Sequence, residues 1–157
     1  MPKHPARLTA LVAAGSVLAL AATVGYLLLP PQQTDTISLP PPDASPEQVV
    51  TVYLDALNAH DCDAAEALMT AGAEGSARAW CNDVASLTDV VVEGHVLERP
   101  EYSGHSDPVA NVPVSFDLSW RPLHDDGSMA EGPTTWGFLL VRDSDGSPWR
   151  IFDQGRG

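Results

Sequence analysis

Three residues combine a side chain that can transfer protons with a place among apolar neighbours: Tyr53, His95 and Asp153. Tyr53 follows the helical spacing of its apolar neighbours, whereas His95 and Asp153 follow a two-residue alternation. Asp117 alternates the other way and is expected to face water. Because apolar surroundings shift a pKa toward the working range of an acid or base, the three are candidates for a proton-transfer pocket. A hydrogen-bonded core or a sheet rim is the competing and more common interpretation of such residues.

The two cysteines, Cys62 and Cys81, favour a disulfide if this part of the chain lies outside the cytoplasm. Such a bond would stabilise the fold by roughly 3 kcal/mol. Two buried free thiols are the alternative. The run His60–Asp63 contains metal-ligand residue types without the spacing of a zinc site. With no phosphate loop or nucleophile motif either, the sequence predicts no metal and no cofactor.

Three helices are expected between residues 45 and 84. Ser45 is placed to cap the first helix, with Pro46 at its first position and Gln48 completing a capping box. Asp61 starts a second, shorter helix, and Ser76 is expected to cap a third. Each helix carries one apolar side, so all three are expected to cover a common core.

From Asp89 onward the apolar period changes to two, which predicts strands. A first strand is broken near Gly94, the alternation over 112–121 marks the second, and 134–141 and 149–152 form the third and fourth. Helices followed by antiparallel strands predict an α+β fold, with three helices packed on a curved antiparallel sheet of about four strands.

The opening SPEQVVTVYLDALNAHDCDAAEALM and the closing DGSPWRIFD resemble the nuclear-transport-factor-2-like superfamily, with its cystatin-like cone. Small bacterial membrane-anchored members without an assigned activity are the most similar, and the resemblance covers residues 45–154. It implies that the sheet and helices enclose a cone. The enzymes of this superfamily, of the ketosteroid isomerase, scytalone dehydratase and polyketide cyclase types, hold a small apolar ligand inside the cone. An Asp or His of that pocket transfers protons. It also implies a homodimer formed through the open sheet.

The N-terminal segment predicts a membrane anchor. No charged residue lies between Leu8 and Leu29, and a helix over this run would be roughly 33 Å long, enough to cross a bilayer. Lys3 and Arg7 precede this run, and positive charges favour the cytoplasmic side of a membrane. Residues 1–29 are therefore expected to form a short cytoplasmic segment and the membrane span, with the remainder of the chain outside. A signal peptide cleaved after Ala21 is the alternative.

Residues 30–44 are rich in proline and are expected to be a semi-rigid spacer between the membrane and the domain over residues 45–157. The alternative is an arm packed on the domain, for which only Ile37 and Leu39 supply apolar contact. The whole chain carries 8 Lys+Arg against 21 Asp+Glu, a net charge of −13, which argues against a nucleic-acid partner.

These features predict a single-pass protein of the cell membrane, held in the bilayer by residues 8–29, with an extracytoplasmic and non-catalytic binding or assembly domain. Its partner would be a second copy or another membrane protein. The alternative is an isomerase, dehydratase or cyclase acting on a hydrophobic small molecule. Such an enzyme needs an enclosed cavity of about 300 Å³ or more with a carboxylate or imidazole inside it.

Overall fold

The computed structural model describes residues 29–99, 108–124 and 129–155. The chain divides into two compact units, Met1–Pro30 and Pro31–Gly157. The expected membrane span lies, apart from Leu29, outside the described residues and stays a prediction. Within the described ranges, no helix has the length and apolar character needed to cross a bilayer.

The helical layer begins as the sequence predicts. Helix α2 (Pro46–Ala59) has Ser45 as its N-cap and both hydrogen bonds of the capping box with Gln48. In α3 (Cys62–Ala67) the Asp61 carboxylate caps the helix by accepting from the amide of Ala64 at 3.2 Å. Both starts depend on residues within three positions of each other, which explains why the sequence reveals them.

The third helix differs from the prediction at its start. Helix α4 spans Glu74–Asp83, and its N-cap is Ala73, which makes no side-chain capping bond. The predicted cap, Ser76, lies inside the first turn instead, where its hydroxyl donates to the carbonyl of Ala73 at 2.8 Å. A serine hydroxyl can bond to the backbone of a turn as well as cap it, so its presence did not fix the boundary.

Five strands form one antiparallel sheet: β1 (Val84–Val92), β2 (Val96–Glu98), β3 (Val109–Trp120), β4 (Gly132–Val141) and β5 (Arg150–Gly155). Their order is β1-β3-β4-β5, and β2 pairs with β3 beyond the end of β1. The α+β class and the three helices are confirmed. The expected sheet of about four strands has five because the first is interrupted near Gly94 and forms two.

Strand β1 begins five residues before the predicted start at Asp89. Its pairing with β3 is irregular between Val84 and Ser86 and again between Thr88 and Val91. These bulges break the two-residue alternation, and Asp89 itself has a φ of +51°. The period on which a sequence-based assignment depends is therefore absent from the first half of the strand.

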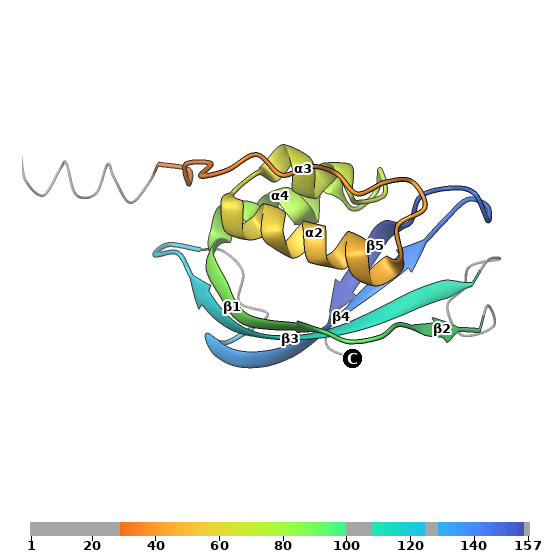
Figure 1. Ribbon diagram of the computed structural model, residues 1–157. Coiled ribbons are helices and arrows are strands. Elements are labelled where there is room, and N and C mark those ends of the chain that lie inside the picture. Colours follow the sequence, from red (N-terminus) through yellow and green to blue (C-terminus); the bar gives the residue numbers. More distant parts are fainter. Residues whose placement is uncertain (1–28, 100–107, 125–128, 156–157) are drawn as a thin grey trace, which may run out of the picture. The chain divides into compact units, whose positions relative to one another are not determined.

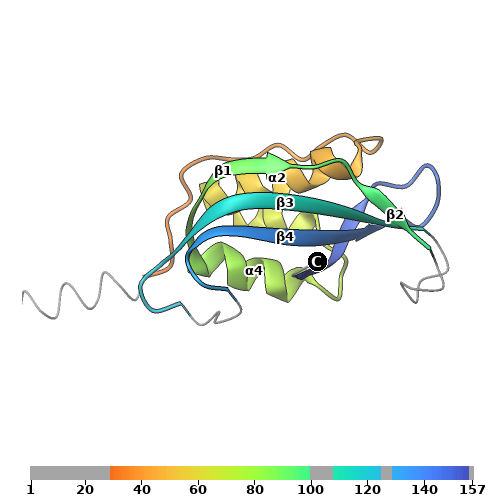
Figure 2. The same ribbon diagram turned by 90° about the horizontal axis from the view of Figure 1, so that it is seen from below.

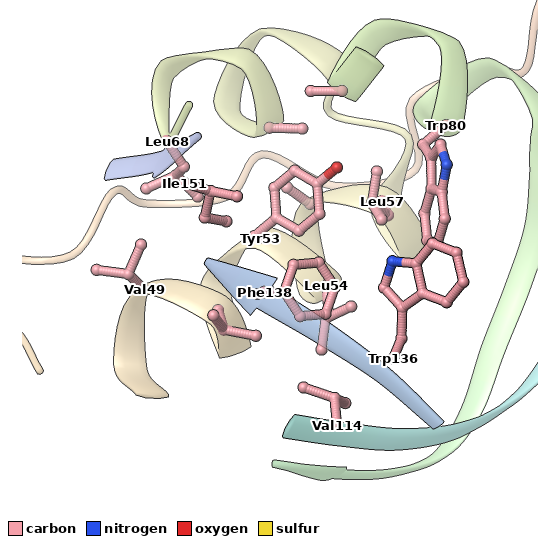
Figure 3. Close-up of a cluster of buried hydrophobic side chains, with 14 of the residues drawn as sticks. Val49, Tyr53, Leu54, Leu57, Leu68, Trp80, Val114, Trp136, Phe138 and Ile151 are labelled. Atoms are coloured by element: carbon pink, nitrogen blue, oxygen red, sulfur yellow. The ribbon is translucent and has the colours of Figure 1, made fainter. Parts of the chain in front are cut away.

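The helices lie together on one face of the curved sheet (Figure 1), and the view from below shows the strands passing in front of them (Figure 2). One core fills the space between the layers. Around Tyr53 the ring of Phe138 packs edge-on, with the ring centroids 5.7 Å apart. Figure 3 shows these side chains pointing toward one another from the helices and from the sheet.

Residues 31–44 do not form the free spacer that their proline content predicts. Thr34 donates its amide to the carbonyl of Ala59 at 2.8 Å, and Ile37 donates its amide to the Asp61 carboxylate at 2.9 Å. Ile37 also packs against the core, and Ala44 is buried. The arm packed on the domain is thus the correct interpretation from Thr34 onward, because Asp61 supplies a hydrogen-bond acceptor that proline content does not reveal.

The chain itself makes hydrogen bonds to one residue on each of two outer strands of the sheet, β5 and β1. Along β5, Ile151 exchanges hydrogen bonds with Leu68 and Thr70, which follow α3. Along β1, the side-chain amide of Asn58 bonds both backbone groups of Leu87, at 2.7 and 2.9 Å. At Ile151 and Leu87 the outer strands are therefore not open to pairing with another strand.

Candidate functional site

Tyr53 is a core residue. It is fully buried, and its hydroxyl donates to Oε1 of Gln154 over a long 3.4 Å. Burial raises the pKa of the Tyr53 phenol well above its usual value, and the hydrogen bond to Gln154 offsets only part of this rise. The phenol is therefore neutral under ordinary conditions and serves packing, as the competing interpretation of the sequence expects.

Asp153 does not point into the core. It is exposed, and its carboxylate accepts from the amide of the next residue, Gln154, at 2.8 Å. The reason is a β-bulge: Leu140 pairs with Ile151 while Leu139 pairs with Asp153, which leaves Phe152 as an extra residue. The extra residue reverses the alternation, so the parity that Asp153 shares with Ile151 in sequence is lost in the sheet. Gln154 takes the inward place.

His95 lies between β1 and β2. Its amide donates to Oε1 of Glu47 at 2.9 Å, and its ring Nδ1 lies 2.6 Å from the same oxygen. Burial alone would raise the pKa of Glu47, but hydrogen bonds from the backbone and ring of His95 and from Ser45 outweigh it and lower the pKa to about 2. Glu47 is thus ionised throughout the physiological range.

A cleft of about 750 Å³ opens beside this pair. Its wall includes His95, the exposed Leu97 and the indole of Trp149, which lies 4.7 Å from the guanidinium carbon of Arg142. Arg142 also pairs with Asp145 at 2.6 Å, within the turn between β4 and β5. The cleft therefore combines an apolar wall with a few charged groups, but it opens to solvent at the end of the sheet and does not lie between the helices and the sheet.

The structure does not bring the three candidates together. Tyr53 is in the core, Asp153 is on the outer face of the sheet, and only His95 reaches a cleft. Glu47 was missed because its position in the first turn of a helix reads as ordinary helix chemistry. Arg142 was missed because its place over Trp149 depends on how the β4–β5 turn closes.

Side chains occupy the space between the helices and the sheet. The residues that meet there are at most 6% exposed, and they come from both the helices and the sheet (Figure 3). They are Val49, Tyr53, Leu54, Leu57, Leu68, Trp80, Val114, Trp136, Phe138 and Ile151. The place where a cone-shaped enzyme would hold its ligand is thus packed with the protein's own side chains.

The predicted disulfide is present. Cys62, the first residue of α3, is bonded to Cys81 of α4, 19 positions further along the chain. Next to it, Asp61 is a buried charged residue whose two carboxylate oxygens accept from the amides of Ile37 and Ala64. The arm, the two short helices and the disulfide therefore meet at one point.

The comparison with protein families matches residues 47–155 to a domain of unknown function, DUF4829. The chain belongs to the DUF4829 family. The DUF4829 match extends from the first turn of α2 to the last residue of β5, so it covers the helical layer and the sheet but not the arm. No curated protein and no solved structure matches the chain.

Proposed function

We propose that the protein is a single-pass protein of the cell membrane whose extracytoplasmic domain serves binding or assembly and performs no reaction. The packed interior carries this proposal, because catalysis in the cone needs room for a substrate. The dispersal of Tyr53, His95 and Asp153 supports it further, since general acid–base chemistry needs groups within reach of one bound molecule.

The anchor rests on the uncharged run Leu8–Leu29 and on Lys3 and Arg7 before it, which favour a cytoplasmic N-terminus. The disulfide between Cys62 and Cys81 is consistent with an oxidising compartment for the domain. Three helices on one face of a bent antiparallel sheet support the further proposal that the domain has the nuclear-transport-factor-2-like fold.

The outer face of the sheet is the surface that best suits a partner, either a second copy or another membrane protein. This face carries Val91 and Val96, whose exposed fractions are 52% and 64%. A shallow hollow of about 460 Å³ lies across β3 and β4, between Pro113 and Gly137. Exposed apolar side chains beside a shaped hollow are typical of an interaction surface.

The anchor is tested by mass spectrometry of the membrane fraction after alkaline carbonate washing. The expected result is an intact N-terminal segment in the washed membranes, together with removal of the domain by a protease added from outside. Recovery of a mature chain beginning after Ala21, or full protection of the domain from that protease, would contradict the proposal.

The second candidate is an isomerase, dehydratase or cyclase, and the His95–Glu47 pair beside the 750 Å³ cleft is the observation in its favour. Proton exchange at the α-carbon of a hydrophobic ketone in D₂O, followed by NMR, tests it against a His95→Gln variant. Exchange that is accelerated by the protein and lost in the variant would favour the enzyme. Equal slow exchange with and without either protein is expected here, because the cleft is open to water.

A further inference from the structure

The chain joins the domain at a defined place. Thr34 donates both its amide and its hydroxyl to the carbonyl of Ala59, at 2.8 and 3.3 Å, near the C-terminal end of α2. The arm then follows the helical layer back to Ser45 at the N-terminal end of α2 (Figure 1). A helix of this length is about 21 Å long, so the first fixed residue and the helix start lie at opposite ends of the domain.

The connection between β3 and β4 begins at the same end as Thr34. Arg121 donates its amide to Asp83 and a guanidinium N–H to Asn82, both at 2.8 Å, and so fixes the end of β3 to the end of α4. Figures 1 and 2 show the start of the arm and this connection on the same side of the domain. We call the residues 31–34, 59–60 and 120–124 the proximal end.

Few residues separate the proximal end from the expected span. Five peptide units join Leu29, the last residue of the uncharged run, to Thr34, and they reach at most about 18 Å. The headgroup layer on each side of a bilayer takes up roughly 6 Å of that length. The domain is wider than the remaining reach, since a chain of this size has a radius of gyration of about 14 Å. With a membrane span that ends at Leu29, as proposed above, the proximal end would lie close to the lipid surface.

An apolar side chain projects at the proximal end. Leu123 is 69% exposed and has a φ of +69°, a backbone conformation that is costly for a leucine. Behind it, the ring of His124 stacks on Trp120, with the centroids 5.1 Å apart and the planes 12° from parallel. An exposed aliphatic side chain on a turn that is fixed to the domain by Arg121 is suited to shallow insertion at a membrane interface.

We propose that the turn Pro122–Leu123 inserts into the boundary between headgroups and acyl chains of the leaflet that the domain faces. The domain then rests on the membrane and turns the cleft beside His95 away from it, toward partners in the extracytoplasmic space. Asp125 and Asp126 follow in the sequence, so the contact is apolar and needs no anionic lipid. This inference depends on the anchor proposed above.

The test uses the full chain in phosphatidylcholine vesicles, made either with ordinary lipid or with lipid brominated near the middle of one acyl chain. Leu123→Trp adds an indole at the turn. Leu97→Trp is the matched control, because Leu97 is 55% exposed but pairs with Ala110, at the other end of β3. The ten residues from Ala110 to Trp120 place the control about 33 Å from the turn.

The expected result is that bromine quenches about half of the emission that Leu123→Trp adds to the wild type, and none of that added by Leu97→Trp. Equal quenching of both, or of neither, in protein that floats with the vesicles would overturn the inference while leaving the anchor intact. Failure of the full chain to float would overturn both. Slower amide exchange around Leu123 in vesicle-bound wild type than in residues 31–157 alone is an expected second readout that needs no variant, and equal exchange would contradict the inference.

Discussion

The side chain of Asn58 makes the hydrogen bonds that a neighbouring strand would make with Leu87 of β1, at the edge of the sheet. Its side-chain amide accepts from the amide of Leu87 at 2.7 Å and donates to the carbonyl of Leu87 at 2.9 Å. These are the two bonds that a neighbouring strand would make with one residue. Asn58→Ala removes both at once and leaves the helix otherwise intact, so it measures what this cover contributes to the fold.

The expected loss follows from the geometry. Two short hydrogen bonds contribute about 1–3 kcal/mol together. The Asn58 side chain is exposed, so water can reach Leu87 in the variant and the penalty of a dry unpaired group does not apply. Alanine is a better helix former than asparagine by about 0.5 kcal/mol, which offsets part of the loss. The net destabilisation is about 1–2 kcal/mol, equivalent to a fall in Tm of about 3–8 °C.

The assay is urea unfolding of residues 31–157, which form one compact unit. Asn111→Ala is the matched control, because the Asn111 amide bonds only a side chain, that of Glu98, and its loss should cost less than about 0.5 kcal/mol. Asn58→Asp keeps the acceptor but not the donor, so it is expected to destabilise as well. If Asn58→Ala unfolds at the same urea concentration as the control, the edge cover is energetically irrelevant and the reasoning fails.

Three further outcomes are expected from residues 31–157. The lowered pKa of Glu47 means that its carboxylate stabilises the fold above its ordinary pKa of 4.5 and that this contribution is lost as the pH falls toward about 2. Over that range the free energy of unfolding of the wild type should fall by about 1–2 kcal/mol more than that of Glu47→Gln. This is less than the pKa shift alone implies, because the Glu47 side chain is 29% exposed. An equal fall in both proteins would contradict the reasoning. The raised pKa of Tyr53 stabilises the fold below about pH 10 and is lost as the pH rises beyond it. Tyr53→Phe should lower the free energy of unfolding by less than about 1 kcal/mol at pH 7, and the stability of this variant should fall less steeply at alkaline pH. If stability falls as steeply in the variant as in the wild type, the buried Tyr53 phenol is not the cause of the alkaline loss. Replacing both Cys62 and Cys81 by alanine should cost about 3 kcal/mol in denaturant unfolding, and a cost below 1 kcal/mol would show that the loop is already ordered in the unfolded chain.

The sequence predicts the starts of α2 and α3 and most strands because the signals are local. The capping box joins Ser45 to Gln48, and the alternation in β3 is complete within one strand. The docking of the arm is different, since Ile37 depends on a carboxylate 24 positions away. Nothing in a proline-rich run indicates that acceptor, and so the composition favoured a free spacer.

The candidate site shows the same division between local and distant causes. His95 was singled out from the alternation of the residues around it, but its partner Glu47 lies 48 positions earlier in the chain. Whether these two groups meet is decided by how the connection between β1 and β2 lies against α2. The spacing of residues within either segment does not reveal this contact.

The bulge in β5 changes which side chains of this strand face the interior, and this bears on the proposed function. With regular alternation, Asp153 would face Tyr53 and place a carboxylate between the helices and the sheet, where burial would raise its pKa toward that of a general acid or base. The extra residue Phe152 sends Asp153 to the outer face and turns Gln154 inward instead. Gln154 is neutral, accepts the Tyr53 hydroxyl, and can neither give nor take a proton at ordinary pH. One inserted residue thus places a neutral glutamine beside Tyr53 instead of a carboxylate with the chemistry of an acid–base enzyme, and this is the physical ground for proposing binding ahead of catalysis.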